Sequence, residues 1–339
     1  MILRLLALIA YPPALLFHAD TYAYLRAAVT LLPGVFRPSL YSIFLWLLIR
    51  VPGLWSVAVV QHLLGLAMGF AIYALLIRLG VSQGWAAVGA APMLLDSYQI
   101  NIEQYVLSET LFEALVLFAV VILLWRRDYL VSRCAASGLA LGLAVLTRPV
   151  GLVVAVPLGL VVLKRAGWRK VSVTAAAFVL PLLLYATWFQ HVYGVFGITD
   201  RDGYFLYARV APFANCSGVA LPSYERILCD PRPAAERPGP NYYLWWSESP
   251  IRELHPPPGV SREAALSDFS KRVIEHQPFT YAGVVLGDIA HYFSPGRWTT
   301  PRDERVAVYR FPLHRTDAGP IPPMLRQFNG RAEAARHLG

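Results

Sequence analysis

Charged residues are scarce in this chain: Asp, Glu, Lys and Arg make up 15% of its 339 residues, whereas 56% are hydrophobic. Soluble domains have about 25% charged and about 45–50% apolar residues, so the composition excludes an ordinary soluble domain and indicates a polytopic membrane protein. The net charge of +9 does not indicate a nucleic-acid partner. Many basic residues before residue 180 lie at the ends of apolar runs, as the positive-inside rule requires.

Recognisable motifs and cysteines are also few. The sequence has no internal repeat, low-complexity block, metal-ligand spacing or glycine-rich phosphate loop. It therefore requires no cofactor, and it leaves the need for a divalent metal ion undecided. Of the three cysteines, Cys216 and Cys229 fall in the polar C-terminal part, whereas Cys134 lies at an expected helix start on the opposite side. We expect a Cys216–Cys229 disulfide if that part is outside the cytoplasm; the alternative is two buried thiols.

The apolar runs predict about seven membrane spans. Met1–Phe17 resembles a signal peptide in composition, but Tyr11-Pro12-Pro13 interrupts its core and no small-residue cleavage site follows. We therefore expect a first span, although the run is shorter than the usual 20 or so residues, and a shortened or mis-assigned start is the alternative. The other expected spans are Trp55–Leu79, Trp85–Ile100, Ser108–Trp125, Arg133–Thr147, Val150–Leu163 and Val171–Trp188.

A cytoplasmic N-terminus puts the basic clusters at 78, 126–133 and 164–170 on the cytoplasmic side. Residues 18–54 then form an outer connection, whose Pro-Gly interruptions predict short interfacial helices. We expect two domains. The first, 1–189, is transmembrane. The second, 190–339, is a small, mostly helical extracytoplasmic domain with helices near Ser261–His276 and Tyr281–Phe293. Its aromatic pair Trp245-Trp246 either stacks on a sugar or, more simply, packs in the core.

Seven ionisable residues lie near the expected outer face. Such groups cost about 2.5–3.5 kcal/mol each at membrane depth, so they tend to mark sites. Tyr105 and Glu109, spaced i and i+4, are expected to share a helical face. Carboxylates converging with two arginines suit a substrate that has an anionic head and a lipid tail. The seven are His18, Asp20 and Arg37 in the first outer connection, Asp96, Glu103 and Glu109 in the second, and Arg148 in the third.

Each candidate also has a simpler interpretation. Asp20 is then a solvated loop acid, and Glu109 is a helix cap or a structural partner of Arg148. Arg148, which precedes Pro149, is then an interfacial arginine whose head reaches water. The same reasoning makes His18 and Arg37 supporting or interfacial groups, and we expect Asp96 and Glu103 to be solvated loop acids.

Five segments resemble, in order, the motifs of bacterial polyprenyl-phosphate-dependent glycosyltransferases with the GT-C fold. That class contains the protein O-mannosyltransferases (family 39) and the lipid A aminoarabinose transferase. Each motif alone is weak, but five in order with compatible topology are much stronger. The segments are Asp20–Leu25 (first-loop aspartate), Arg37–Leu45 (Arg/His-Pro-Pro-x-Tyr), Gln104–Phe112 (Ser-Glu-Thr-Leu-Phe), Leu146–Pro149 (Leu-x-Arg-Pro) and Tyr193–Gly197 after the seventh span.

The resemblance implies a GT-C-like helical bundle in the bacterial plasma membrane. It also implies transfer of a hexose or pentose from a polyprenyl-phosphate donor to a hydroxyl of a glycan, lipid or protein acceptor, with inversion. Asp20 would be the base. The donor phosphate would be held by Arg148 and Arg37, with Glu109, Tyr105 and His18 in support.

Two features depart from the family. Asp20 stands alone where the family often has an acidic pair, and no further span is expected after residue 190. A shortened chain, divergence and a partner that supplies the missing spans all remain open. Two other classes of protein remain open as well: a secondary transporter, disfavoured because no repeated halves are visible, and a non-catalytic membrane subunit of an envelope polysaccharide machine.

Overall fold

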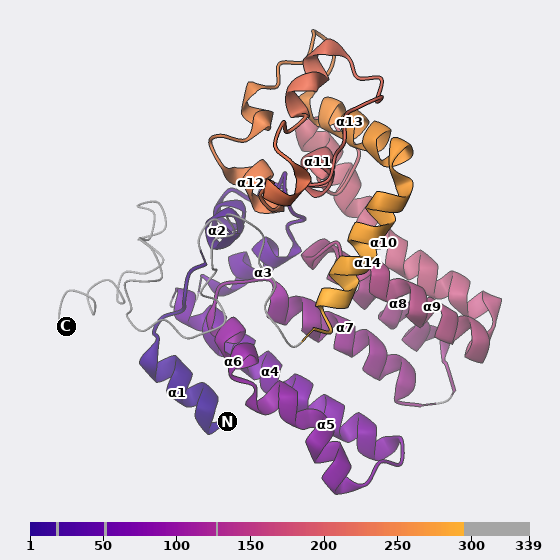
Figure 1. The fold of residues 1–339 in the computed structure, drawn as a ribbon. Helices are drawn as coiled ribbons and strands as arrows, with labels where there is room; N and C mark the ends of the chain where they lie inside the picture. Colours follow the sequence, from indigo (N-terminus) through magenta and orange to yellow (C-terminus); the bar gives the residue numbers. More distant parts are fainter. Residues whose placement is uncertain (18–19, 51–52, 127, 295–339) are drawn as a thin grey trace, which may run out of the picture. The chain divides into compact units, whose positions relative to one another are not determined.

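The computed structural model describes residues 1–17, 20–50, 53–126 and 128–294, and these ranges are all-helical, as expected. Across them there is no β-strand, only an isolated parallel bridge between Leu15 and Tyr105. The chain divides into two compact units, one over Met1–Thr199 and one that begins at Asp200 (Figure 1). The division falls after residue 199 rather than 189 because helix α10 continues to Tyr193.

The first unit contains ten helices within its described residues. Proline and glycine explain several of their ends: α1 stops before Tyr11-Pro12-Pro13, and α9 and α10 are separated by Gly167, whose positive φ of 80° favours glycine. The helices are α1 (Ile2–Ala10), α2 (Asp20–Thr30), α3 (Leu40–Leu48), α4 (Leu54–Arg78), α5 (Gln83–Leu95), α6 (Ser97–Gln104), α7 (Glu109–Leu124), α8 (Val131–Thr147), α9 (Gly151–Ala166) and α10 (Trp168–Tyr193).

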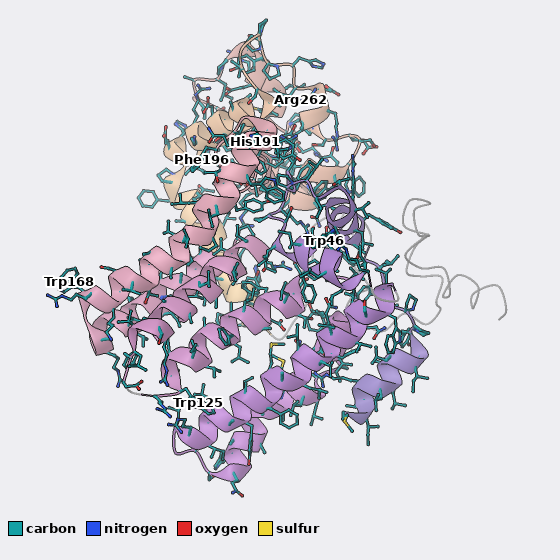
Figure 2. All side chains as sticks on the ribbon, turned by 180° about the vertical axis from the view of Figure 1, so that it is seen from behind. Trp46, Trp125, Trp168, His191, Phe196 and Arg262 are labelled. Atoms are coloured by element: carbon teal, nitrogen blue, oxygen red, sulfur yellow. A yellow bond between two sulfur atoms is a disulfide. The ribbon has the colours of Figure 1, made fainter. Side chains whose placement is uncertain are left out.

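The long helices of this unit pack along one another. α4 contacts α5 and α7, and α8 lies between α7 and α10. The α8–α10 contact is close because α8 presents Gly138 and Gly142, four residues apart, to the backbone of α10. A Cβ atom at either position would collide with the carbonyl oxygen of Thr174 or Phe178. Trp168, at the start of α10, points outward (Figure 2) and is exposed.

Within the described part of the chain, two helices, α4 with 25 residues and α10 with 26, are long and apolar enough to cross a membrane. This supports membrane association by length and composition. Helices also occupy the other five stretches expected to be spans, but they are shorter: 9 residues in α1, 13 in α5, 16 in α7, 17 in α8 and 16 in α9.

The expected span Trp85–Ile100 is wrong in its extent, because two helices occupy it. α5 ends at Leu95, and the side chain of Asp96 then accepts a hydrogen bond from the Tyr98 amide at 2.9 Å and caps α6. The short helices expected in the first outer connection are present as α2 and α3.

The second unit packs its helices around an aromatic core. Tyr207, Tyr243 and Phe269 are fully buried with edge-on rings, and Trp246 packs against the core, whereas Trp245 is exposed. The expected helix at 261–276 is α13 (Arg262–His276), and the expected helix at 281–293 is α14 (Pro278–His291), which starts three residues earlier. The other helices are α11 (Asp202–Val210), α12 (Pro240–Trp245) and three 3-10 turns, at Ser223–Leu228, Ala234–Glu236 and Pro250–Glu253.

A disulfide and a buried aspartate hold loops of this unit in place. Cys216 and Cys229 form a disulfide with an S–S distance of 2.01 Å. Asp230, next to Cys229, is buried and accepts hydrogen bonds from Arg232 and Tyr243. Burial alone would raise the pKa of Asp230, but these hydrogen bonds lower it to about 2.

Candidate functional site

The amino-terminal acid opens a helix and is paired. Asp20 is the first residue of α2, where the positive end of the helix dipole favours a carboxylate. Its Oδ2 lies 2.7 Å from Nη1 of Arg37, and the two side chains are 26% and 34% exposed. Burial alone would lower the pKa of Arg37, but Tyr24 and Asp20 more than offset this and raise it above its ordinary value. Arg37 is therefore a permanent cation in a half-buried ion pair.

Tyr24 links this pair to a distant part of the chain. Its hydroxyl accepts a hydrogen bond from Arg37 Nη1 at 3.2 Å, and the Arg37 guanidinium carbon lies 5.7 Å from the centre of its ring. The same hydroxyl lies 2.9 Å from Oγ of Ser108. Because Ser108 directly precedes α7, Tyr24 connects α2 to the connection between α6 and α7.

Glu109 and Arg148 form the second pair. Glu109 is the first residue of α7, and Arg148 directly follows the last residue of α8. A carboxylate Oε1 and a guanidinium Nη1 meet there, with 28% of the Glu109 side chain and 38% of the Arg148 side chain exposed. Oε2 of Glu109 is buried and has no hydrogen-bond partner. Of the two simpler interpretations of Glu109, a helix cap or a structural partner of Arg148, the structure contains the pairing.

We call the two ion pairs, Asp20–Arg37 and Glu109–Arg148, the paired cluster. Its members come from the α2 start, the α2–α3 connection, the α7 start and the α8 end. Tyr24 and Ser108 join them, and sequence reasoning gave neither residue a role. The cluster places two guanidinium groups and two carboxylates at partly exposed positions, where an anion can bind to arginine and a carboxylate can accept a proton.

The expectation that Tyr105 and Glu109 share a helical face is wrong. α7 begins at Glu109, and Tyr105 lies before it in extended backbone, with φ −80° and ψ 146°. The Tyr105 ring packs edge-on against Phe17 at 6.4 Å between ring centres, and the residue is buried. Tyr105 is therefore a packing residue of this connection. His18 lies outside the described residues.

The expectation that Glu103 is a solvated acid is also wrong. Glu103 is fully buried in α6 and forms a two-pronged ion pair with Arg4 of α1, at 2.7 and 2.8 Å. Asp96, by contrast, is exposed, as expected, and caps α6. The available signal for the buried pair was Arg4 itself, because a lone charge in an apolar run needs a partner once it is buried.

The buried pair belongs to a larger polar cluster. The ring nitrogens of His62 lie 2.8 Å from Glu103 Oε2 and 2.8 Å from Gln104 Oε1. The Gln99 amide donates to Glu103 and, at 3.0 Å, to Glu113 of α7. These contacts fasten α1, α4, α6 and α7 together in the interior of the unit.

Two other features lie away from the paired cluster. An apolar hollow of about 250 Å³ lies between α1 and the α5–α6 bend, and no member of the paired cluster lines it. Among residues 1–17, 20–50, 53–126 and 128–294, no group of three or more His, Cys, Asp or Glu side chains could hold a metal ion.

Comparison with known proteins gave no match, whether to protein-family models, to curated protein sequences or to solved structures.

Proposed function

We propose that this chain is a membrane glycosyltransferase that moves a sugar from a polyprenyl-phosphate donor to an acceptor hydroxyl. The observation that carries the proposal is the paired cluster. It joins residues of four of the five segments that resemble the GT-C transferases, although those segments are up to 128 residues apart (20 to 148). In this proposal the seven apolar stretches form a GT-C-like bundle in the bacterial plasma membrane, and the unit from Asp200 onward is extracytoplasmic.

The proposed reaction needs one base and one anion site. Asp20 takes the proton of the acceptor hydroxyl, and the acceptor oxygen bonds to the anomeric carbon with inversion. The bond from that carbon to the phosphate oxygen breaks, and its electron pair stays on the phosphate. Arg148 and Arg37 stabilise the charge that develops there through hydrogen bonds that strengthen as it grows. Glu109 orients Arg148.

The ion pairs add a step to this scheme. A carboxylate oxygen that is hydrogen-bonded to arginine is not free to accept a proton from an acceptor hydroxyl. A donor phosphate competes with Asp20 for Arg37 and with Glu109 for Arg148. When the phosphate takes over Arg37, the carboxylate oxygen of Asp20 that faced Arg37 is free to accept the proton of the acceptor hydroxyl.

The test is transfer by Asp20→Asn in membranes supplied with a polyprenyl-phosphate sugar. General-base groups contribute roughly 10²–10⁴-fold, so we expect kcat to fall by about that factor while donor binding is retained. Asp128→Asn is a matched control, because this aspartate is exposed and pairs with Arg133 near the ends of α7 and α8 opposite to Glu109 and Arg148. Turnover by Asp20→Asn at the wild-type rate would remove Asp20 as the base.

A secondary transporter is the second candidate, and one observation favours it. Buried ionisable groups inside a membrane bundle often line ion pathways, and Arg4, Glu103 and His62 form such a group. Flux of a labelled substrate into proteoliposomes, with no transfer product, would favour the transporter. Transfer without flux would favour the glycosyltransferase.

A further inference from the structure

Gln61 is a buried amide next to the buried His62 in α4, a candidate membrane span. Burying an amide without hydrogen bonds costs several kcal/mol, so an amide at such a position needs a full set of partners. Gln61 has them. Its Nε2 donates to the carbonyl oxygens of Glu103 at 2.9 Å and Tyr105 at 2.7 Å, and its Oε1 accepts from the Tyr41 hydroxyl at 2.7 Å.

These bonds complete the C-terminal end of α6. The last four carbonyls of a helix have no partner within it. In α6, the Tyr105 amide donates hydrogen bonds to the carbonyl oxygens of Asn101 and Ile102. The Leu15 amide donates to the Gln104 carbonyl at 2.9 Å, and Gln61 supplies the remaining bond, to Glu103. The end of α6 is thus fixed by two distant parts of the chain rather than by its own sequence.

The connection that follows α6 leads directly to the paired cluster. It runs from Tyr105 to Ser108, and Glu109 then begins α7. The Val106 amide donates a hydrogen bond to the Leu15 carbonyl at 2.9 Å. The backbone of Leu15 therefore holds the last residue of α6 and also the connection that follows it. A shift of the α6 end would therefore move Ser108, which contacts Tyr24, and Glu109, which pairs with Arg148.

Gln61 also reaches the other ion pair through Tyr41. The Tyr41 ring is fully buried and lies edge-on to Tyr24, with 4.9 Å between ring centres. Tyr24 in turn accepts a hydrogen bond from Arg37. One amide therefore fixes the backbone before Glu109 on one side and the tyrosine that supports Arg37 on the other.

We propose that Gln61 is a positioning residue of the paired cluster, which sets the distance between Asp20–Arg37 and Glu109–Arg148 through the 105–108 connection and Tyr41. This inference rests on the proposed function for its effect on turnover, but its effect on the connection can be measured without any activity.

The experiment uses the full-length chain in nanodiscs. Gln61→Met keeps the length of the side chain and removes both donors, and Tyr41→Phe removes only the hydroxyl. In the folded protein, we expect faster hydrogen exchange over residues 105–109 for Gln61→Met. We expect kcat/KM per folded molecule to fall about tenfold to 100-fold, because errors of about 1 Å in positioning cost this much. Tyr73→Phe, about three turns further along α4, should change neither.

A cycle with Ser108→Ala separates positioning from general stability. If Gln61 acts through the connection, the loss in the double variant is smaller than the product of the two single losses. Unchanged exchange over 105–109 in both Gln61→Met and Tyr41→Phe would overturn the inference, whether or not the transferase proposal holds. Unchanged kcat and KM with faster exchange, in membranes where the wild type is active, would overturn it as well. A wild type inactive with every donor would count against the transferase alone.

Discussion

Replacing Arg4 with methionine tests how the first unit is held together. The guanidinium is 2% exposed and makes four hydrogen bonds: two to the Glu103 carboxylate, at 2.7 and 2.8 Å, and two to the carbonyls of Leu94 and Met93, at 2.8 and 2.9 Å. Methionine fills the stem but satisfies none of these acceptors. The fully buried carboxylate keeps only His62 and Gln99 as partners.

The size of the loss follows from burial. Removing one partner of a buried ion pair costs about 3–5 kcal/mol, because the other charge stays behind without compensation. An exposed pair is worth about 1 kcal/mol or less. For a domain of 150–250 residues, 1 kcal/mol corresponds to about 2–4 °C in Tm, so Arg4→Met should lower the Tm of this unit by roughly 6–20 °C.

Cys134 provides a built-in reporter for the measurement. It is the free cysteine of the described residues and is fully buried in the first unit, whereas Cys216 and Cys229 are joined. A thiol-reactive fluorescent dye therefore reports unfolding of the first unit in detergent. Arg26→Met, at an exposed arginine of α2, is the matched control and should leave the Tm nearly unchanged. A shift below about 2 °C for Arg4→Met would refute the reasoning, since it would assign Arg4 the energy of an exposed pair.

Two further predictions concern packing and pH. A Cβ at Gly65 would overlap the Glu103 carboxylate, so Gly65→Ala should lower the free energy of unfolding by about 1–3 kcal/mol in the same dye assay. Gly84 has open space around it, so Gly84→Ala is the control and should be neutral or slightly stabilising. Equal effects of the two substitutions would contradict the prediction. The pKa of Asp230, about 2 against an ordinary 3.8, corresponds to about 2 kcal/mol of unfolding free energy that is present above about pH 4 and lost as the pH falls through about 2. Asp230→Asn should therefore lower the free energy of unfolding by up to this amount at pH 7, as measured by urea unfolding with tryptophan fluorescence. A difference in unfolding free energy between Asp230→Asn and wild type that stays constant down to about pH 2 would contradict the prediction.

The helices that could be predicted from the sequence carry their own boundary signals. α13 was predicted at 261–276 and begins at Arg262. The Ser261 hydroxyl accepts from the Ala264 amide at 3.0 Å, and Pro278 follows the helix end. α6 has no comparable apolar stripe. Its end is fixed by Gln61 and Leu15, which lie dozens of residues away, so local pattern alone could not locate it.

The same distinction applies to the candidate site. The residue types were predictable, because carboxylates and arginines at the ends of apolar runs are unusual. The pairing of Glu109 with Arg148 was one of the alternatives that the sequence left open. The Asp20–Arg37 pair and the bridge through Tyr24 were not predicted, because tyrosine at an apolar–polar boundary has many uses. The burial of Glu103 depends on Arg4, 99 residues away, and nothing near Glu103 in the sequence indicates it.

Exposure separates the two kinds of ion pair in this unit. Arg4 and Glu103 are 2% and 0% exposed, so opening that pair costs several kcal/mol and fixes it as part of the scaffold. The side chains of the paired cluster are 26–38% exposed, where water can replace each lost contact and separation costs about 1 kcal/mol. An anionic substrate can supply that amount with one hydrogen bond to an arginine. The partly exposed pairs can therefore exchange partners at low cost. In the proposed reaction, Asp20, Arg37, Glu109 and Arg148 carry the chemistry, and the buried pair supplies the rigidity around them.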